Sequence, residues 1–150
     1  MTRLTSVLHA RIRRHDPEYG LSTLFFGGGE LRVPMLALPP DAAVRVEIDA
    51  RDVSIALSRP MDVSITNRLP GRIMAVERLT LPYAKVVFDL GPAALLALVT
   101  VESVVRLALE PGLKAWAMIK TVAISESDVS PDLTASPWPP SPIPPSRIPD

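Results

Sequence analysis

Four polar side chains stand at the ends of expected elements in the second half of the chain: Ser64, Thr66, Ser103 and Lys120. Hydroxyls, backbone amides and one ammonium group can together replace the water shell of a small oxyanion. The same residue types also form turns, cap helices and stand as solvated charges. The residue types alone leave two interpretations open, an oxyanion site or ordinary turn and capping chemistry.

Two of these side chains belong to short local elements. Residues 64–73, "SITNRLPGRI", read as a turn that opens into an apolar strand. Ser103 lies in "TVESVVRLALEPGLK", where Thr100 suits the N-cap of a helix of one or two turns. Gly112 suits the stop that follows it. The sequence therefore predicts a short helix that carries Ser103.

An apolar alternation that changes phase occurs twice in the chain. In residues 113–124 the alternating set changes at Lys120, and in residues 44–57 it changes at Arg51. A phase change in a strand with one buried face predicts a bulge or a sharp bend. The two segments align at a constant offset of 69 residues (120 − 51 = 69).

The repeat extends backward, because residues 4–12 align with residues 65–73 at an offset of 61. Two copies of mostly short strands predict an all-β protein of two small OB-fold-like barrels, each with at most a short helix. The copies differ in the middle, where Pro34 stands at the position of Ser103. We therefore expect the first copy to have lost any site of this kind.

Three regions follow from the repeat. We expect a first, diverged copy over residues 1–59, a second copy over residues 60–126, and a disordered tail over residues 127–150. Eight of the 17 prolines lie in residues 130–150. Proline has no amide donor, and the segment has few apolar groups to offset the entropy of ordering it. We expect residues after 127 to contribute nothing to folding.

Composition narrows the function. Lys plus Arg and Asp plus Glu are 16 each, and aromatic residues are 5%, which argues against a nucleic-acid partner. The chain has no cysteine and two histidines, so no metal site is predicted. No phosphate-binding loop or nucleophile elbow occurs, so we predict no catalytic residues and no enzyme activity for this chain. No apolar run reaches the length of a membrane span, which favours a cytoplasmic protein.

The second copy resembles the TOBE or Mop domain. The family pattern S-[AI]-R-N followed by G-x-[IV] stands here as "SITNRLPGRI", and I-T-x-x-S-x-x-x-L-x-L-x-x-G stands as "VTVESVVRLALEPG". The I-K of the last strand is Ile119 and Lys120. The preceding stretch "ARDVSIAL" is similar to the C-terminal regulatory region of the ATP-binding subunit of molybdate ABC transporters. The resemblance covers residues 4–126. It implies the regulatory region of such a subunit, which we expect here without the ATPase domain.

The resemblance also implies a ligand, a site and partners. The ligand would be molybdate or tungstate, with no cofactor, bound between the subunits of a homodimer. The binding residues carried over are Ser64, Ile65 through its backbone amide, Thr66, Ser103 and Lys120. The partners would be the ATPase domain and the membrane permease, so the chain would lie in the cytoplasm at the inner face of the membrane.

One departure from the family pattern bears on affinity. Thr66 stands where the family has arginine, and a hydroxyl gives neither the charge nor the planar fork of a guanidinium. We expect binding to be weaker or absent. Two main interpretations follow: a regulatory oxyanion-binding and dimerisation module, or a structural dimerisation domain whose anion site has decayed. An oligonucleotide-binding barrel is a third, which the zero net charge disfavours.

Overall fold

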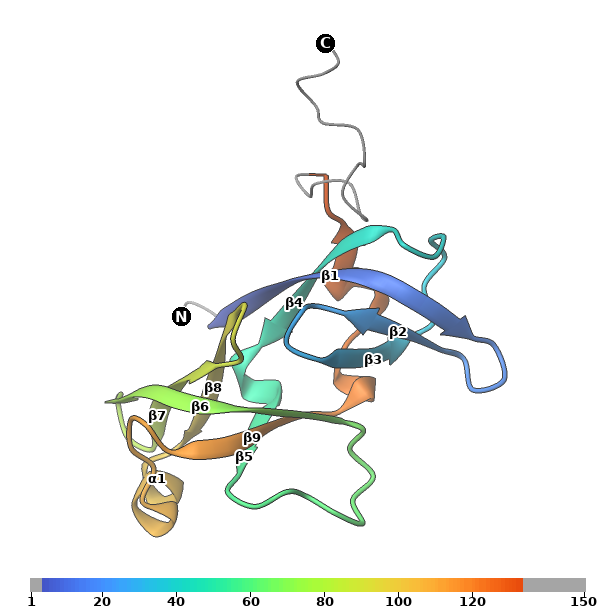
Figure 1. Cartoon of the computed structure of the whole chain (residues 1–150). Helices are drawn as coiled ribbons and strands as arrows, with labels where there is room; N and C mark the ends of the chain where they lie inside the picture. The colour runs from blue at the N-terminus through green and yellow to red at the C-terminus, as the bar shows by residue number, and fades with distance from the viewer. Residues whose placement is uncertain (1–3, 134–150) are drawn as a thin grey trace.

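Within residues 4–133, the chain forms ten strands in two antiparallel five-stranded sheets (Figure 1). The computed structural model describes residues 4–133. The first sheet has the spatial order β10 (Val129–Pro131), β4 (Ala43–Asp49), β1 (Thr5–Asp16), β2 (Leu21–Phe25), β3 (Glu30–Pro34). The second has the order β5 (Val53–Ala56), β9 (Lys114–Ile119), β6 (Asn67–Arg78), β7 (Tyr83–Asp89), β8 (Ala94–Thr100). The helical elements are α1 (Val101–Leu107) and the 3-10 turns η1 (Ala50–Asp52), η2 (Thr121–Ala123) and η3 (Glu126–Asp128).

The two sheets repeat one another strand for strand, which confirms the all-β fold of two OB-like barrels. Even the irregularities recur: the register of β1 shifts between Ile12 and Arg14, and that of β6 between Ile73 and Ala75. The separation is 61 residues (73 − 12 = 61), as the sequence alignment predicted for this part of the repeat.

The phase change in each copy is a single 3-10 turn, not a bulge within a strand. Asp49 is the N-cap of η1 and Lys120 is the N-cap of η2; the residue after each turn, Val53 or Ile124, donates its amide back to the turn's first residue. The offset is therefore 71 (120 − 49 = 71), and the predicted match of Lys120 to Arg51 is wrong. Alternation has a period of two, so apolar residues align equally well when the register moves by two.

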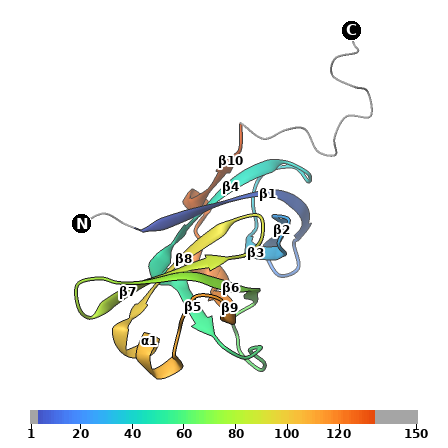
Figure 2. The same cartoon turned by 60° about the vertical axis from the view of Figure 1, so that its left-hand side comes forward.

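The two copies exchange their last strands (Figures 1 and 2). β5 follows β4 and η1 of the first copy but pairs with β9 of the second sheet. β10 follows β9 and η2 of the second copy but pairs with β4 of the first sheet. The chain therefore passes from the first sheet to the second before residue 59, the boundary expected between the two copies, because β5 already belongs to the second sheet.

Residues 127–133 belong to this fold, which corrects the expectation that they are tail. Besides forming β10, they bring in Asp132, whose backbone N–H donates to the Ala43 carbonyl at 2.9 Å. The Asp132 carboxylate, almost fully buried, lies 2.7 Å from His9 Nδ1. Apolar content was a poor guide because strand pairing and one polar contact hold the segment. The rest of the expected tail, residues 134–150, lies outside the described residues.

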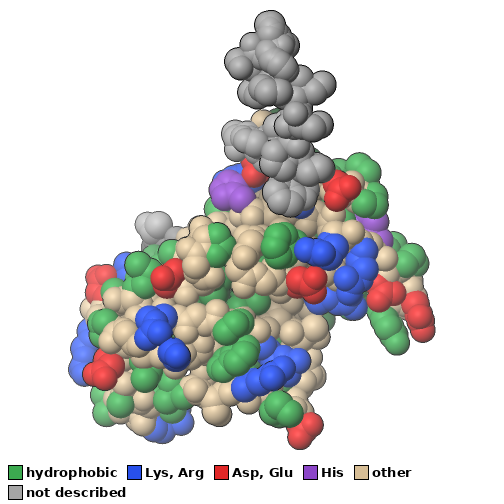
Figure 3. All heavy atoms as spheres, in the orientation of Figure 1, with side chains coloured by type: hydrophobic (Ala, Val, Ile, Leu, Met, Phe, Trp, Pro, Cys, Tyr) green, Lys and Arg blue, Asp and Glu red, His purple; other side chains and the backbone are tan. Residues whose placement is uncertain are grey.

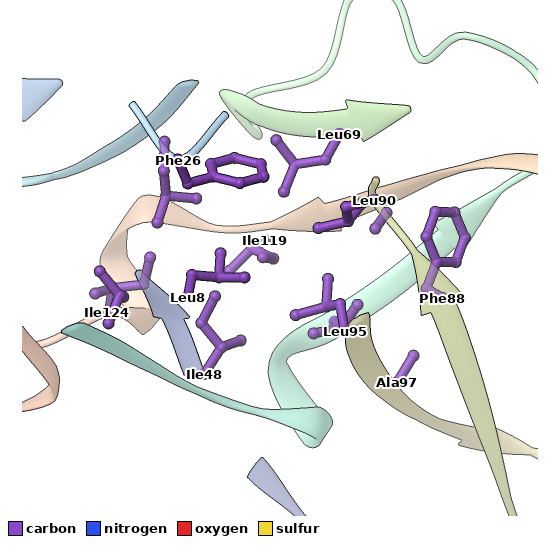
Figure 4. Packing of buried hydrophobic residues seen from close by; sticks show 14 of the residues in the cluster. Leu8, Phe26, Ile48, Leu69, Phe88, Leu90, Leu95, Ala97, Ile119 and Ile124 are labelled. Atoms are coloured by element: carbon purple, nitrogen blue, oxygen red, sulfur yellow. The ribbon is translucent and has the colours of Figure 1, made fainter. Parts of the chain in front are cut away.

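One apolar core runs through both barrels. Figure 4 shows Leu8 and Ile48 of the first sheet near Leu95 and Ile119 of the second, all nearly or fully buried. The strand exchange explains the shared core, since each fifth strand crosses from one barrel to the other. The shared core therefore holds together the strands that lead to the candidate site residues.

Candidate oxyanion site

The segment "SITNRLPGRI" is not a closed turn, because β6 begins at Asn67 and runs through Pro70 and Gly71. Pro70 is tolerated because the pairing with β7 begins only at Arg72. Gly71 is required by close packing: a Cβ there would lie 2.4 Å from the Asp89 carbonyl oxygen. β6 thus begins at the residue that directly follows Thr66.

Thr66 and Lys120 lie next to each other where β6 begins and β9 ends. Asn67 and Ile119 are paired at the end of the β6–β9 ladder, so the next residues outward, Thr66 and Lys120, come adjacent. Ser64 and Ile65 directly precede Thr66. We call Ser64, Ile65, Thr66 and Lys120 the first half-site.

The first half-site is open to solvent. Ser64, Thr66 and Lys120 are exposed and Ile65 is half-buried. Among residues 4–133, no carboxylate forms an ion pair with Lys120. Within the described part of the chain, an anion would therefore not have to break an ion pair to reach the ammonium.

Ser103 lies at the other end of the same sheet. Thr100 caps α1 as predicted, accepting a hydrogen bond from the Ser103 N–H at 3.1 Å and donating one to Ser103 Oγ at 3.0 Å. The helix ends with Ala108 in the left-handed conformation, before the predicted stop at Gly112. α1 leads into the start of β9, whereas Lys120 follows its end, and six strand residues span roughly 20 Å. Figures 1 and 2 likewise show α1 away from the loop that precedes β6, so one chain does not bring Ser103 to the first half-site.

Sequence reasoning missed a cation beside Ser103. Arg106 Nη2 lies 3.4 Å from Ser103 Oγ, on the same face of α1 one turn later. The i, i+3 spacing on the predicted helix was the signal that could have indicated it. We call Ser103 and Arg106 the second half-site.

Within residues 4–59, the first copy has no equivalent of either half-site. In the first copy, Asp49 occupies the position that corresponds to Lys120. Asp49 pairs with Thr5, just as Lys120 lies beside Thr66. Pro34 ends β3, and residues 35–42 contain no α-helix. A carboxylate where the second copy has an ammonium would repel an oxyanion. The loss of the site in the first copy stays a prediction.

A groove of about 450 Å³ lies elsewhere on the second barrel. Its lining includes Arg72, Lys114, Asp89 and Trp116, and none of the five predicted site residues. Within residues 4–133, no helix is long and apolar enough to cross a bilayer, and no three or more His, Asp or Glu side chains are grouped to hold a metal ion. The predicted oxyanion residues thus stand at exposed element ends and not in this groove.

Comparison with known proteins identifies the second copy. The TOBE domain family model matches residues 63–125, which contain both half-sites. Residues 63–125 are a TOBE domain. The match starts just before Ser64 and ends just after η2, so it includes every residue of the sequence-based site prediction.

The similarity to curated proteins extends beyond the TOBE domain. The molybdenum import ATP-binding protein ModC of Mesorhizobium japonicum is 39% identical over 123 residues, which are 82% of this chain and 33% of that protein. ModC 2 of Azotobacter vinelandii is 44% identical over 121 residues, 80% of this chain and 34% of that protein. The chain thus spans about a third of the length of these curated relatives.

The fold has a counterpart among solved structures. The cytoplasmic molybdate-binding protein ModG, solved with molybdate bound, matches with a TM-score of 0.66 at 23% identity. The match covers 83% of this chain and 92% of the ModG chain, so it takes in the repeat preceding the TOBE domain as well. At this level of identity the comparison supports the two-barrel fold.

Proposed function

We propose that this chain is the molybdate-binding regulatory module of a molybdate import ATPase. The observation that carries the proposal is the pairing of β6 with β9, which brings Thr66 next to Lys120 inside a TOBE domain. Among residues 4–133, the Lys120 ammonium has no ion-pair partner. The names of the ModC relatives and of ModG supply the ligand class. The module would act on the cytoplasmic side, attached to an ATPase domain and a membrane permease, and would be regulatory and not catalytic.

The complete site forms between two copies of the chain in this proposal. Each chain carries two half-sites at opposite ends of β9, and neither alone surrounds an anion. A second copy that brings its second half-site against the first half-site completes the shell, as expected for a symmetric dimer. Molybdate or tungstate would then bind at the subunit interface.

Exposed apolar side chains beside both half-sites support this interface. Val122, two residues after Lys120, is 86% exposed, and Met61 is 66% exposed shortly before Ser64. Leu81, 75% exposed, lies beside α1, because the next residue's carbonyl accepts the amide of the first helical residue. Contiguous exposed apolar patches are typical of surfaces that bind another protein, and an interface at these two ends would gather and bury these side chains. A second copy of this chain would cover both sets.

Arg106 changes the charge balance of the proposed site. Thr66 gives no charge at the family arginine position, but Arg106 brings a guanidinium next to Ser103 from the other half-site. A dianion between the two chains would meet Lys120 of one copy and Arg106 of the other. A guanidinium can donate two parallel hydrogen bonds to an oxyanion, so this placement offsets the loss at Thr66.

Thermal unfolding with added anions tests the function. A ligand that binds only the folded state stabilises it by about 2.7 kcal/mol at a hundredfold excess over Kd, which is a shift of several degrees. Molybdate and tungstate should give this shift, and the smaller sulfate much less. Sedimentation equilibrium should show a dimer at tens of micromolar, and a monomer there would count against the intersubunit site.

A structural dimerisation domain with a decayed site is the second candidate, and the uncharged Thr66 favours it. Calorimetry separates the two candidates. Molybdate heat in Thr66→Arg but none in the wild type would support decay. No heat in either protein, at concentrations where the dimer forms, would reject oxyanion binding by this chain. An oligonucleotide function is less supported, since Figure 3 shows acidic and basic side chains intermingled on the visible face.

A further inference from the structure

The outer edge of β3 is covered by side chains from the second barrel. β3 is the last strand of the first sheet, so the backbone groups on its outer side have no strand partner among the described residues. Asn67 Oδ1 accepts a hydrogen bond from the Arg32 N–H at 2.7 Å, and Asn67 Nδ2 donates one to the Arg32 carbonyl at 2.9 Å. A side-chain amide has the donor and acceptor of a peptide group, so Asn67 takes the place of a neighbouring strand.

Thr121 completes this contact. Its Oγ1 donates to the Arg32 carbonyl at 3.1 Å and accepts from Asn67 Nδ2 at 3.3 Å. The Asn67 side chain is buried, with 2% of the residue exposed. Buried polar groups are costly when unpaired, so these mutually satisfied bonds hold the three residues in one arrangement.

Both arms of the first half-site are attached to this contact. Asn67 directly follows Thr66, and Thr121 directly follows Lys120. We propose that Asn67 and Thr121 are positioning residues for the oxyanion site, and that the first barrel is the support that holds them, an inference that rests on the proposed function. The diverged first copy would then set the geometry of a site to which it contributes no ligand.

The repeat provides a matched control. Ser6 is the counterpart of Asn67 (67 − 61 = 6), and its Oγ accepts the Leu96 N–H at 2.8 Å on β8, the edge strand of the second sheet. The contact joins the same two barrels but lies next to Thr5 and Asp49, where the first copy has no half-site. Ser6→Ala therefore loosens the junction between the barrels without touching the anchors of Thr66 and Lys120.

The experiment compares four variants of the full chain. Asn67→Ser leaves a shorter hydroxyl side chain, as at Ser6, and removes the Nδ2 amide that donates to Arg32 and Thr121. Thr121→Val loses the hydroxyl at nearly constant shape, and Thr121→Ser restores it. Ser6→Ala is the control for general loosening. The NMR order parameters of the Thr66 and Lys120 backbone amides are measured without ligand, and molybdate affinity is measured by calorimetry.

Positioning predicts lower order parameters at Thr66 and Lys120 in Asn67→Ser and Thr121→Val, with wild-type values in Thr121→Ser and Ser6→Ala. Molybdate affinity should fall about tenfold in the first two variants, the scale on which outer partners act on bound ions. Unchanged order parameters in Asn67→Ser, or an equal decrease in Ser6→Ala, would overturn the inference. Lower order parameters with no molybdate heat in the wild type would support the anchoring and reject the proposed function.

Discussion

The two copies of the repeat have the same strands, the same irregularity in the long strand and the same 3-10 turn, but opposite charges at the turn's N-cap. Asp49 stands in the first copy and Lys120 in the second. Both residues have extended backbone conformations. In both copies the residue after the turn donates its amide to the carbonyl of the turn's first residue. The barrel is therefore kept by backbone pairing and apolar packing, which tolerate either charge, while the proposed site depends on a few side chains at element ends.

Making the second copy like the first should have the largest effect on binding. Lys120→Asp puts a carboxylate beside Thr66, and its repulsion of a dianion should remove the entire molybdate-induced shift in melting temperature. Stability without ligand should stay within about 0.5 kcal/mol of the wild type, because Lys120 is exposed. The control is Arg51→Asp, an exposed charge change of the same sign at η1, which should leave the shift intact. A molybdate shift that survives Lys120→Asp would remove the ammonium from the proposed site.

Removing an exchanged strand should have the next largest effect, because each sheet takes its outer strand from the other copy. A chain that ends at residue 126 lacks β10 and the buried Asp132, and should unfold several degrees lower than one that ends at Leu133. Loss of two to three hydrogen bonds at about 1 kcal/mol each gives this scale. Using Leu133 as the reference end keeps residues outside the described structure out of the comparison. Equal melting temperatures would mean that β10 does not stabilise the first sheet.

A third test separates the two half-sites. Arg106→Gln removes the guanidinium beside Ser103 but keeps a hydrogen-bonding side chain of good helix propensity. Molybdate affinity should fall about tenfold, since a charge-assisted hydrogen bond contributes about 1.5 kcal/mol or more. Calorimetry against Arg78→Gln, an exposed arginine at the end of β6, provides the control. Equal affinities in the two variants would show that Arg106 does not compensate for Thr66.

Local signals in the sequence predicted the elements but not their exchange. The alternation in residues 44–57 indicated a strand with one buried face, and Thr100 indicated the start of a helix, because both depend on near neighbours. The partner sheet of β5 could not be read from the same residues, since a buried face does not specify which sheet provides the cover. The same ambiguity of register led to Arg51 in place of Asp49 as the counterpart of Lys120.

The site was predictable only as a set of residue types. Family spacing selected Ser64, Thr66, Ser103 and Lys120, but the distance between the two ends of β9 appears only once the strands are paired. Asn67 was visible in the motif, yet its contacts with β3 join residues 35 positions apart and leave no periodic trace. The support that the other barrel gives to the site depends on tertiary contacts, which a short stretch of sequence does not indicate.

The smallest expected effect comes from neutralising the first copy. Asp49→Asn removes the carboxylate charge but keeps an oxygen that can accept the Arg51 amide at the start of η1. If the charge at this position were the sole difference between the copies, the change would create a second anion site. We expect no such site, because residues 35–42 contain no helix and so nothing presents a hydroxyl and a guanidinium as α1 does. Calorimetry should give one molybdate per chain in both proteins, with each symmetric dimer forming two sites. A stoichiometry that rises toward two per chain in Asp49→Asn would show that the first copy lost its site through Asp49 alone.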